Sequence, residues 1–302
     1  MTDLLFPQTS NQSAQAGTIY VVATPIGNLD DMTFRAVKIL QTVDRIAAED
    51  TRHTGRLLQH FQVKTPQISY HEHNHQQRVG EMIEKLQQGE SIALVTDAGM
   101  PGISDPGYEL IKACVEAKIP VVPIPGCSAV ITALSAAGLP TDRFVFEGFL
   151  PVKGQERVTR LGELSREVRT IVIYESPHRL RQTLQDLAET LGAERPVVLA
   201  RELTKLHEEF WRGSLGAAQE MYTTREPKGE FTLVIGGFQA LEVSLSPAVI
   251  RDELRDLLIK GMSRSQASRH LAKLTSIPRQ QLYQIALEID LEVDLEIKLE
   301  SE

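Results

Sequence analysis

The chain has 302 residues, 42% of them hydrophobic, and carries 32 Lys and Arg against 40 Asp and Glu, which gives a net charge of −8. The hydrophobic fraction excludes a wholly disordered protein, and the sequence contains no run of about 18 apolar residues that would span a membrane. A net negative charge also argues against a nucleic-acid-binding protein, whose surface is normally basic.

The first residues have neither a targeting pattern nor a folding pattern. They lack the basic and apolar stretches of a secretory signal, so we expect a cytoplasmic protein. Residues 1–16 are polar and without period, which predicts a disordered leader. Cys114 and Cys127 do not have the spacing of a disulfide framework or a zinc site, and each is predicted to be a small buried residue.

Residues 17–139 alternate short apolar runs with segments of helical period. This alternation predicts an α/β domain with a mostly parallel sheet. The expected strands are residues 19–23, 45–48, 68–70, 91–96 and 120–123, and the expected helices are residues 33–41, 54–61, 77–88, 108–117 and 129–137. Gly138 and Pro140 then form a helix stop signal, and we expect a domain boundary there.

A second set of strands and helices follows in residues 140–245. The expected strands are residues 144–149, 170–174, 197–200 and 231–235, and the expected helices are near residues 156–167, 178–191 and 216–222. Several connections between the strands are short, which predicts a mixed sheet in this second domain. Residues 246–287 then have a helical pattern almost throughout, with helices expected at residues 249–260, 264–274 and 279–287.

Charge is distributed unevenly at this end of the chain. Residues 288–302 hold seven acids and one base, which predicts a disordered acidic tail. Residues 257–287, in contrast, hold five bases and no acid. Short helices with a basic surface resemble a helix-turn-helix module and suit contact with phosphates, whereas a helical cap packed on the rest of the chain is the alternative. Most of the net negative charge therefore lies in the acidic tail and not in the rest of the chain.

Glycine and proline gather in two loops. Residues 97–107 contain three glycines and two prolines directly after an expected strand, and residues 123–129 also connect a strand to a helix. Because ligands of open α/β sheets bind beyond the carboxyl ends of the strands, these loops predict the walls of one pocket. The chain has neither GxGxxG after its first strand nor GxxxxGK[ST], which disfavours NAD and ATP bound by those routes.

Eight motifs, in order and over about residues 17–236, carry a family resemblance. They are TPIGNLDDMTFRA, AAEDTRHT, VTDAGMPGISDPG, PIPGCSAVITALSAAGLPTDRF, FEGFLP, YESPHR, ARELTKLHE and GEFTLVI. The chain resembles the ribosomal RNA small subunit methyltransferase I family of the tetrapyrrole (corrin/porphyrin) methylase superfamily. The resemblance implies a two-domain α/β fold with S-adenosylmethionine in the interdomain cleft, a helical terminal module and a homodimer. It implies as acceptor the 2′-hydroxyl of a cytidine in the decoding region of 16S rRNA, in the small ribosomal subunit.

Carried over to this sequence, the resemblance implies cofactor-binding residues in both domains. These are Pro25, Asp97, Ala98, Gly99, Gly102, Ile103, Ser128, Ala129, Tyr174, Glu175, Ala200, Gly229, Glu230, Phe231 and Thr232. Tetrapyrrole-acting relatives have Gly-Gly-Asp-Pro where this chain has Asp-Ala-Gly-Met at residues 97–100, so the contact made by Asp97 is left open.

Methyl transfer to a ribose hydroxyl requires alignment with the methyl group and a group that accepts the proton. Residues 201–209 hold six ionisable side chains directly after an expected strand. Glu202 and Lys205 are three residues apart and would tune each other's pKa if this segment were helical. A lysine of lowered pKa, or the glutamate, is the expected proton acceptor, and the solvated start of a charged helix is the alternative.

Contacts with RNA are expected from basic side chains in several regions. These are Arg52, His53, Arg179, Arg201, Arg264, Arg269, Lys273 and Arg279. The histidines at positions 71, 73 and 75 would share one face of a strand, but without a fourth ligand we expect a polar rim and no metal.

Two other functions stay open as alternatives. A tetrapyrrole C-methyltransferase is compatible with the fold, but the basic helical module and the missing Gly-Gly-Asp-Pro argue against it. A non-catalytic RNA-binding assembly factor is the other alternative, and a test of cofactor binding would discriminate it.

Overall fold

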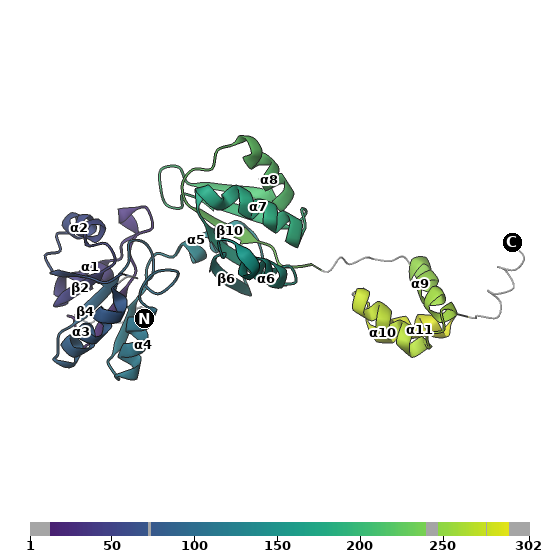
Figure 1. The fold of residues 1–302 in the computed structure, drawn as a ribbon, viewed down its shortest axis with the longest axis horizontal. Helices are drawn as coiled ribbons and strands as arrows, with labels where there is room; N and C mark the ends of the chain where they lie inside the picture. The colour runs from purple at the N-terminus through teal and green to yellow at the C-terminus, as the bar shows by residue number, and fades with distance from the viewer. Residues whose placement is uncertain (1–12, 72–73, 240–246, 276, 290–302) are drawn as a thin grey trace, which may run out of the picture. The chain divides into compact units, whose positions relative to one another are not determined.

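The computed structural model describes residues 13–71, 74–239, 247–275 and 277–289. The chain forms two compact units, Met1–Gly237 and Phe238–Glu302. The first unit contains two five-stranded sheets, and the described part of the second is helical (Figure 1). The expected leader and acidic tail lie almost wholly outside the described residues.

The first sheet is parallel throughout and has the order β3-β2-β4-β1-β5. Its strands are β1 (Ile19–Val22), β2 (Arg45–Ala48), β3 (Gln67–Ser69), β4 (Ile92–Val95) and β5 (Val121–Ile124). Every residue of β1 and β4 is buried, because helices cover both faces of a parallel sheet. The predicted parallel α/β domain is therefore confirmed.

Helices cover the two faces of this sheet in pairs. They are α1 (Phe34–Thr42), α2 (Thr51–His60), α3 (His75–Gln87) and α4 (Tyr108–Glu116), and a 3-10 turn, η1 (Leu29–Asp31), precedes α1. Side chains alternate along a strand, so Tyr20 and Val22 pack with α1 and α2, whereas Ile19 packs with α3 and α4. Thr33 and Asp50 accept hydrogen bonds from first-turn amides and so begin α1 and α2.

The second sheet is mixed and has the order β6-β7-β10-β8-β9. Its strands are β6 (Phe144–Phe149), β7 (Thr170–Glu175), β8 (Pro196–Arg201), β9 (Glu209–Ser214) and β10 (Phe231–Ile235). Strand β6 runs parallel to β7, and the other pairs are antiparallel. The mixed sheet was predicted, but β9 was not. This edge strand is half exposed and contains Gly213 and charged residues, so it lacks the apolar run that marks a buried strand.

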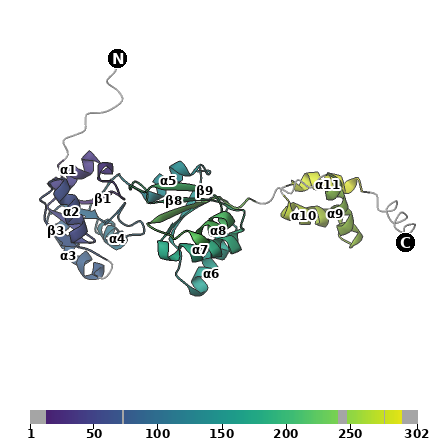
Figure 2. The ribbon, with the colours of Figure 1, turned by 90° about the horizontal axis from the view of Figure 1, so that it is seen from above.

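Four helices pack on this second sheet. Helices α6 (Gly154–Leu164), α7 (Pro177–Leu191) and α8 (Leu215–Thr224) cover one face, and α5 (Ala129–Ala137) covers the other (Figure 2). The boundary expected near Pro140 would put α5 in the first domain. The structure instead buries Val130 and Leu134 of α5 against Val172 and Val234 of the second sheet. A stop signal marks where a helix ends, but it does not indicate which sheet the helix packs on.

The second unit is built from three amphipathic helices, α9 (Pro247–Ile259), α10 (Arg264–Leu274) and α11 (Arg279–Leu287). Leu254, Leu271 and Leu282 bring one apolar side chain from each helix into a common core. Ser263 and Gln266 form a capping box that begins α10. Within the described ranges, none of the helices has both the length and the apolar character needed to cross a membrane.

Candidate functional site

The loops after β1 and β4 are joined at the carboxyl edge of the first sheet. Thr24 N donates to the Gly99 carbonyl at 2.9 Å, and Gly99 N donates to the Thr24 carbonyl at 3.0 Å. The hydroxyl of Thr24 also donates to the Thr96 carbonyl at 3.0 Å. These buried contacts fix the glycine-rich loop at residues 97–107 beside the loop at residues 25–28.

The loop after β5 approaches the same edge closely. A Cβ atom on Gly126 would lie 2.8 Å from the Cβ of Ala23, so a side chain at this position would push the loop away from β1. Ser128 is the N-cap residue of α5, but its hydroxyl makes no capping hydrogen bond. The hydroxyl therefore stays available to a ligand at the positive end of this helix.

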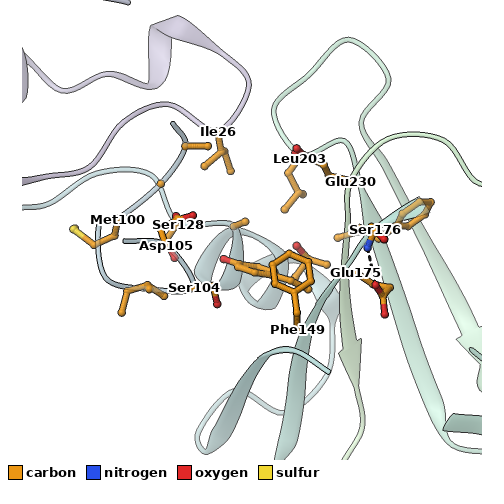
Figure 3. A pocket seen from close by; sticks show the side chains of 18 of the residues that line it. Ile26, Met100, Ser104, Asp105, Ser128, Phe149, Glu175, Ser176, Leu203 and Glu230 are labelled. Atoms are coloured by element: carbon orange, nitrogen blue, oxygen red, sulfur yellow. Dashed lines mark hydrogen bonds between the residues drawn. The ribbon is translucent and has the colours of Figure 1, made fainter. Parts of the chain in front are cut away.

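These loops and the second sheet enclose a cavity of about 440 Å³, within the usual range for small-molecule sites. Figure 3 shows Met100, Ser104, Asp105 and Ser128 on one side, and Leu203, Glu230, Ser176 and Glu175 on the other. Ile26 and Phe149, also labelled there, line the cavity too. Both predicted glycine-rich loops thus contribute to one pocket.

The structure brings most of the expected cofactor-binding residues to this cavity. They are Ala98, Gly99, Ile103, Ser128, Ala129, Tyr174, Glu175, Ala200, Glu230, Phe231 and Thr232. Pro25 and Asp97 line a neighbouring cavity instead, and Gly102 and Gly229 line neither.

Several lining residues were missed by sequence reasoning. They are Ile26, Met100, Ser104, Asp105, Phe149, Ser176, Pro177 and Leu203. All eight lie inside the motifs that carried the resemblance, so their position next to residues already chosen was the signal that would have found them.

The wall formed by the first half of the unit contains Asp105 and is backed by further carboxyl groups. Asp97 N donates to Glu49 Oε2 at 3.4 Å, and Asp97 Oδ1 accepts from Asp50 N at 3.3 Å. Burial raises the pKa of Asp105 to about 7, and the negative charges of Glu49 and Asp97 add to this rise. Burial and the nearby Asp97 also raise the pKa of Glu49. Asp105 therefore exchanges its proton near neutral pH.

The wall formed by the second half adjoins an ion-paired cluster, which joins Glu202 and Lys205 of the β8–β9 loop to Glu230, directly before β10. Lys205 Nζ lies 2.8 Å from Glu202 Oε1 and 3.0 Å from Glu230 Oε2. Glu230 N also donates to Glu202 Oε1 at 3.0 Å. The segment was expected to be a helix if Glu202 and Lys205 were to meet, but it is a loop in which Glu202 and Thr204 have left-handed backbone angles. Such strained residues often occur at functional sites.

The protonation state of Lys205 differs from the one expected for a proton acceptor. Burial alone would lower the pKa of Lys205, but the hydrogen bonds to Glu202 and Glu230 outweigh it and raise this pKa. The hydrogen bond from Lys205 lowers the pKa of Glu202. The expectation of a lysine with lowered pKa is thus corrected: Lys205 stays an ammonium group and Glu202 stays a carboxylate.

Gly229 has a structural role beside this cluster. Its φ angle is 80°, and a Cβ atom there would lie 2.4 Å from Cγ of Glu202. A glycine is therefore required for Glu202 to reach its partners. Gly229 lines neither cavity, and its close approach to Glu202 gives it a part in holding the loop.

Tyr174 and Glu175, at the end of β7, both line the cavity. The ring of Tyr174 packs between those of Phe146 and Phe149, with centroids 4.9 and 5.7 Å apart. The carboxylate of Glu175 is buried and accepts hydrogen bonds from Ser176 N at 2.8 Å and from the Thr183 hydroxyl at 2.6 Å. This carboxylate therefore anchors the start of α7.

Two arginines expected to contact RNA are engaged internally. Arg179 Nε lies 3.4 Å from Glu175 Oε1, and its guanidinium also donates to the Leu150 carbonyl. Arg201 Nε donates to the Lys228 carbonyl at 2.6 Å, and its Nη1 lies 3.3 Å from Glu209. Both guanidinium groups hold loops together, a role that the residue type alone does not indicate.

The other expected RNA contacts are more exposed. Arg52 and His53 lie at the start of α2, where Arg52 is paired with Asp50 at 2.8 Å. In the second unit, Arg264 donates to the Ala286 and Ile289 carbonyls and Arg279 donates to the Ser265 hydroxyl.

Arg269 shares an open concavity of the second unit with Lys260 and His270. The side chain of Lys273 lies outside the described residues. His73 and the side chain of His75 lie outside them too, and the part of the chain that is described contains no group of three potential metal ligands.

A second cavity of about 470 Å³ adjoins the first and shares Ile26, Ala98 and Glu230 with it. Pro25, Leu29, His53, Arg56, Asp97 and Lys205 are among its lining residues. The arrangement can hold one ligand in each cavity, with their reacting atoms meeting at the shared boundary.

Comparison with known proteins agrees with this geometry. Residues 18–219 match the family described as Tetrapyrrole (Corrin/Porphyrin) Methylases. The ribosomal RNA small subunit methyltransferase I of Synechocystis sp. is 61% identical over 274 residues, covering 90% of this chain and 98% of that protein. The protein of the same name from Pseudomonas aeruginosa is 45% identical over 275 residues, covering 90% and 98%.

Solved structures with low sequence identity show the same fold. A uroporphyrin-III-C-methyltransferase from Thermus thermophilus has a TM-score of 0.53 at 20% identity, covering 72% of this chain and 94% of that chain. A structure of that enzyme type complexed with S-adenyl homocysteine has a TM-score of 0.53 at 15% identity, covering 72% and 97%. The chain therefore belongs to the tetrapyrrole methylase family and, within it, to the ribosomal RNA small subunit methyltransferase I family.

Proposed function

We propose that the chain is an S-adenosylmethionine-dependent methyltransferase of small-subunit ribosomal RNA, and that it methylates the 2′-hydroxyl of a cytidine in the decoding region of 16S rRNA. The observation that carries this proposal is the 61% identity, over 90% of the chain, to a ribosomal RNA small subunit methyltransferase I. The cavity between the two sheets supplies a site of suitable size for the cofactor.

The residues around this cavity fit the chemical groups of S-adenosylmethionine. The free hydroxyl of Ser128 and the amide end of α5 suit its carboxylate. Asp105 suits a positively charged group, and Ile26, Phe149 and Leu203 offer apolar contact to the remainder. Each part of the cofactor therefore finds a complementary surface in the same cavity.

Bound there, S-adenosylmethionine supplies a methyl group whose bond to sulfur breaks as the bond to the hydroxyl oxygen forms, leaving S-adenosylhomocysteine and releasing the hydroxyl proton. Lys205 and Glu202 are the proposed catalytic pair, in revised roles. The Lys205 ammonium donates to the acceptor oxygen and orients it, while Glu202 fixes Lys205. A carboxylate is left to take the proton, either Glu230 at the boundary or Asp97 in the second cavity.

We also propose how the chain meets its substrate. The basic side chains of the second unit, Arg269 and Lys260 among them, contact RNA phosphates, and binding should weaken as salt rises. The family resemblance further supports a homodimer in the cytoplasm. Light scattering coupled to size exclusion would test the dimer.

The proposal is tested with small subunits that lack the modification. They are incubated with the chain and with S-adenosylmethionine labelled on its methyl group, and the labelled nucleotide is then mapped. Label on one cytidine ribose of 16S rRNA is the expected result. Label on a base, on free porphyrinogen or on no RNA would overturn the proposal, and a lack of cofactor binding by calorimetry would favour a non-catalytic assembly factor.

A further inference from the structure

The second cavity, which meets the first at Ile26, Ala98 and Glu230, has no ligand assigned to it so far. Methyl transfer requires the acceptor oxygen to lie in line with the methyl group, and the shared boundary is the place where a ligand in the second cavity can approach a cofactor in the first. We propose that the second cavity receives the acceptor ribonucleotide of a single-stranded RNA segment, with its phosphate on Arg56 and His53 and its ribose at the boundary. This inference rests on the methyltransferase function proposed above.

One face of α2 supplies the cationic side of the cavity. His53, Arg56 and Leu57 are spaced at i, i+3 and i+4, so they lie on the same face of the helix. Among the residues that the structure describes, neither the His53 imidazole nor the Arg56 guanidinium has a hydrogen-bond or ion-pair partner, and both residues are exposed. Arg52, by contrast, is paired with Asp50. An arginine held on a cavity wall without a carboxylate partner is suited to a phosphate.

The opposite charge lies at the boundary between the cavities. Glu230 lines both of them, and Asp97 precedes Ala98, which also lines both. Carboxylates accept hydrogen bonds from ribose hydroxyls, whereas they repel phosphates. Lys205 Nζ lies 3.0 Å from Glu230 Oε2 and adds a donor at the same place. This distribution orients a nucleotide with its ribose at the boundary and its phosphate toward α2.

Apolar side chains provide the remaining surface. Pro25, Leu29 and Leu57 line the cavity, and Leu29 is 40% exposed. A base can pack on such a surface only when it is not stacked within a helix. A nucleotide in a loop, or one flipped out of its stack, meets this condition at the lowest energetic cost. The geometry thus points to an unpaired acceptor nucleotide.

The competing occupant is a part of the cofactor that extends from the first cavity into the second. Arg56 discriminates the two, because a phosphate contact of RNA affects only the RNA substrate. The variants are Arg56→Gln and Arg56→Glu, and the matched controls are Arg166→Gln and Arg166→Glu, since Arg166 is exposed and lines neither cavity. Three quantities are measured for each: the KM for unmethylated small subunits, the Kd for S-adenosylmethionine, and the salt dependence of RNA binding.

We expect Arg56→Gln to raise the KM for small subunits on the order of tenfold, and Arg56→Glu to raise it further, because a charge-assisted hydrogen bond is lost. The slope of log affinity against log salt should fall by about 0.7, the value for one phosphate of single-stranded RNA. The Kd for S-adenosylmethionine should not change. A weakened cofactor Kd in the Arg56 variants would assign the cavity to the cofactor and overturn the inference.

Equal behaviour of the Arg56 and Arg166 variants would also overturn the inference. The proposed function is judged separately, on the unsubstituted chain. Methylation of rRNA by that chain, together with Arg56 variants that match their controls, would leave the function standing while removing the nucleotide site. Failure of the unsubstituted chain to methylate rRNA would remove the function itself.

Discussion

The two halves of the first unit hold their acidic side chains in opposite ways. In the first half, Glu49 and Asp105 lie near Asp97, and in the described residues none of the three forms an ion pair with lysine or arginine. Burial raises the pKa of Glu49 and of Asp105. In the second half, Glu202 is paired with Lys205, and Glu209 with Arg225 and Arg201, and these partners lower the pKa of both glutamates.

This difference in pKa gives the acidic side chains of the two halves different tasks near one cavity. A carboxyl group with a pKa near 7 changes its charge under physiological conditions and so responds to a charged ligand. Carboxylates with a lowered pKa keep their charge and their partners, and here they hold the β8–β9 loop in its strained conformation. The first wall is therefore suited to binding that is coupled to protonation, and the second wall is suited to positioning.

Of the predicted substitutions, removal of Lys205 from the second wall should have the largest effect on turnover. Lys205→Ala leaves Glu202 and Glu230 without their shared donor, and we expect turnover to fall on the order of 100-fold, as for the loss of one positioned donor. Single-turnover methylation measures this loss. Calorimetry should show unchanged cofactor affinity, because Lys205 does not line the first cavity.

Two further variants control this experiment. Lys205→Arg keeps the cation and should recover part of the rate. Glu202→Gln should also reduce turnover, since it removes the charge that fixes Lys205. Full activity in both Lys205→Ala and Glu202→Gln would show that the ion-paired cluster has no part in the reaction.

The Glu209 ion pairs test whether the second wall depends on fixed charge for its stability. Arg225 donates two hydrogen bonds to Glu209, which is one-third exposed, so Glu209→Gln should lower the free energy of unfolding by about 1–2 kcal/mol at pH 7. A lowered pKa contributes stability above the ordinary carboxyl range, and this contribution is lost as pH falls through the lowered value. The difference between variant and unsubstituted chain should therefore shrink toward pH 3.

Urea unfolding followed by tryptophan fluorescence measures this effect. The chain has one tryptophan, Trp211, which lies on β9 two residues after Glu209, so the signal reports on this strand. Glu220→Gln is the control, because Glu220 is exposed on α8. A loss of stability that stayed the same from pH 7 to pH 3 would mean that packing, and not charge, holds the hairpin.

The sequence allowed the first wall to be predicted better than the second. The loop at residues 97–107 directly follows a buried strand, so its glycines and prolines predicted a ligand site from local pattern alone. The structure confirms that both glycine-rich loops line one cavity. Ser104 and Asp105 were missed, although they lie in the same loop.

The second wall depends on pairing between segments that are distant in the sequence. Glu230 approaches Glu202 because β10 pairs with β8, and this register has no local signal. Charge composition around Arg201 left open whether the segment is helical, whereas the antiparallel pairing of Arg201 with Glu209 produces a hairpin. The same reason explains why the internal contacts of Arg179 and Arg201 were not predicted. Their guanidinium groups bind carbonyl oxygens that only the fold brings near.

Of the predicted substitutions, that of Asp105 should have the smallest effect, which is on cofactor affinity. It is also the most direct test of the first wall. Its pKa is raised to about 7, so binding of a cofactor with net positive charge should favour the ionised form and release a proton. Cofactor affinity should then rise several-fold, and less than about tenfold, from pH 6 to pH 8. Asp105→Asn should remove this dependence, whereas Asp142→Asn, at an exposed position, should keep it. Calorimetry in buffers of different ionisation enthalpy measures the released proton.

Folding stability provides an independent measurement on the same side chain. A carboxyl group with a raised pKa contributes stability that is complete below its ordinary pKa near 4 and is lost as pH rises through about 7. Asp105→Asn should therefore gain about 1–2 kcal/mol relative to the unsubstituted chain between pH 5 and pH 8, after allowance for solvent screening. If this gain appeared while cofactor affinity stayed constant with pH, Asp105 would titrate without sensing the ligand. The first wall would then be acidic for a reason other than cofactor binding, and its carboxyl groups would serve the second cavity, which Asp97 lines.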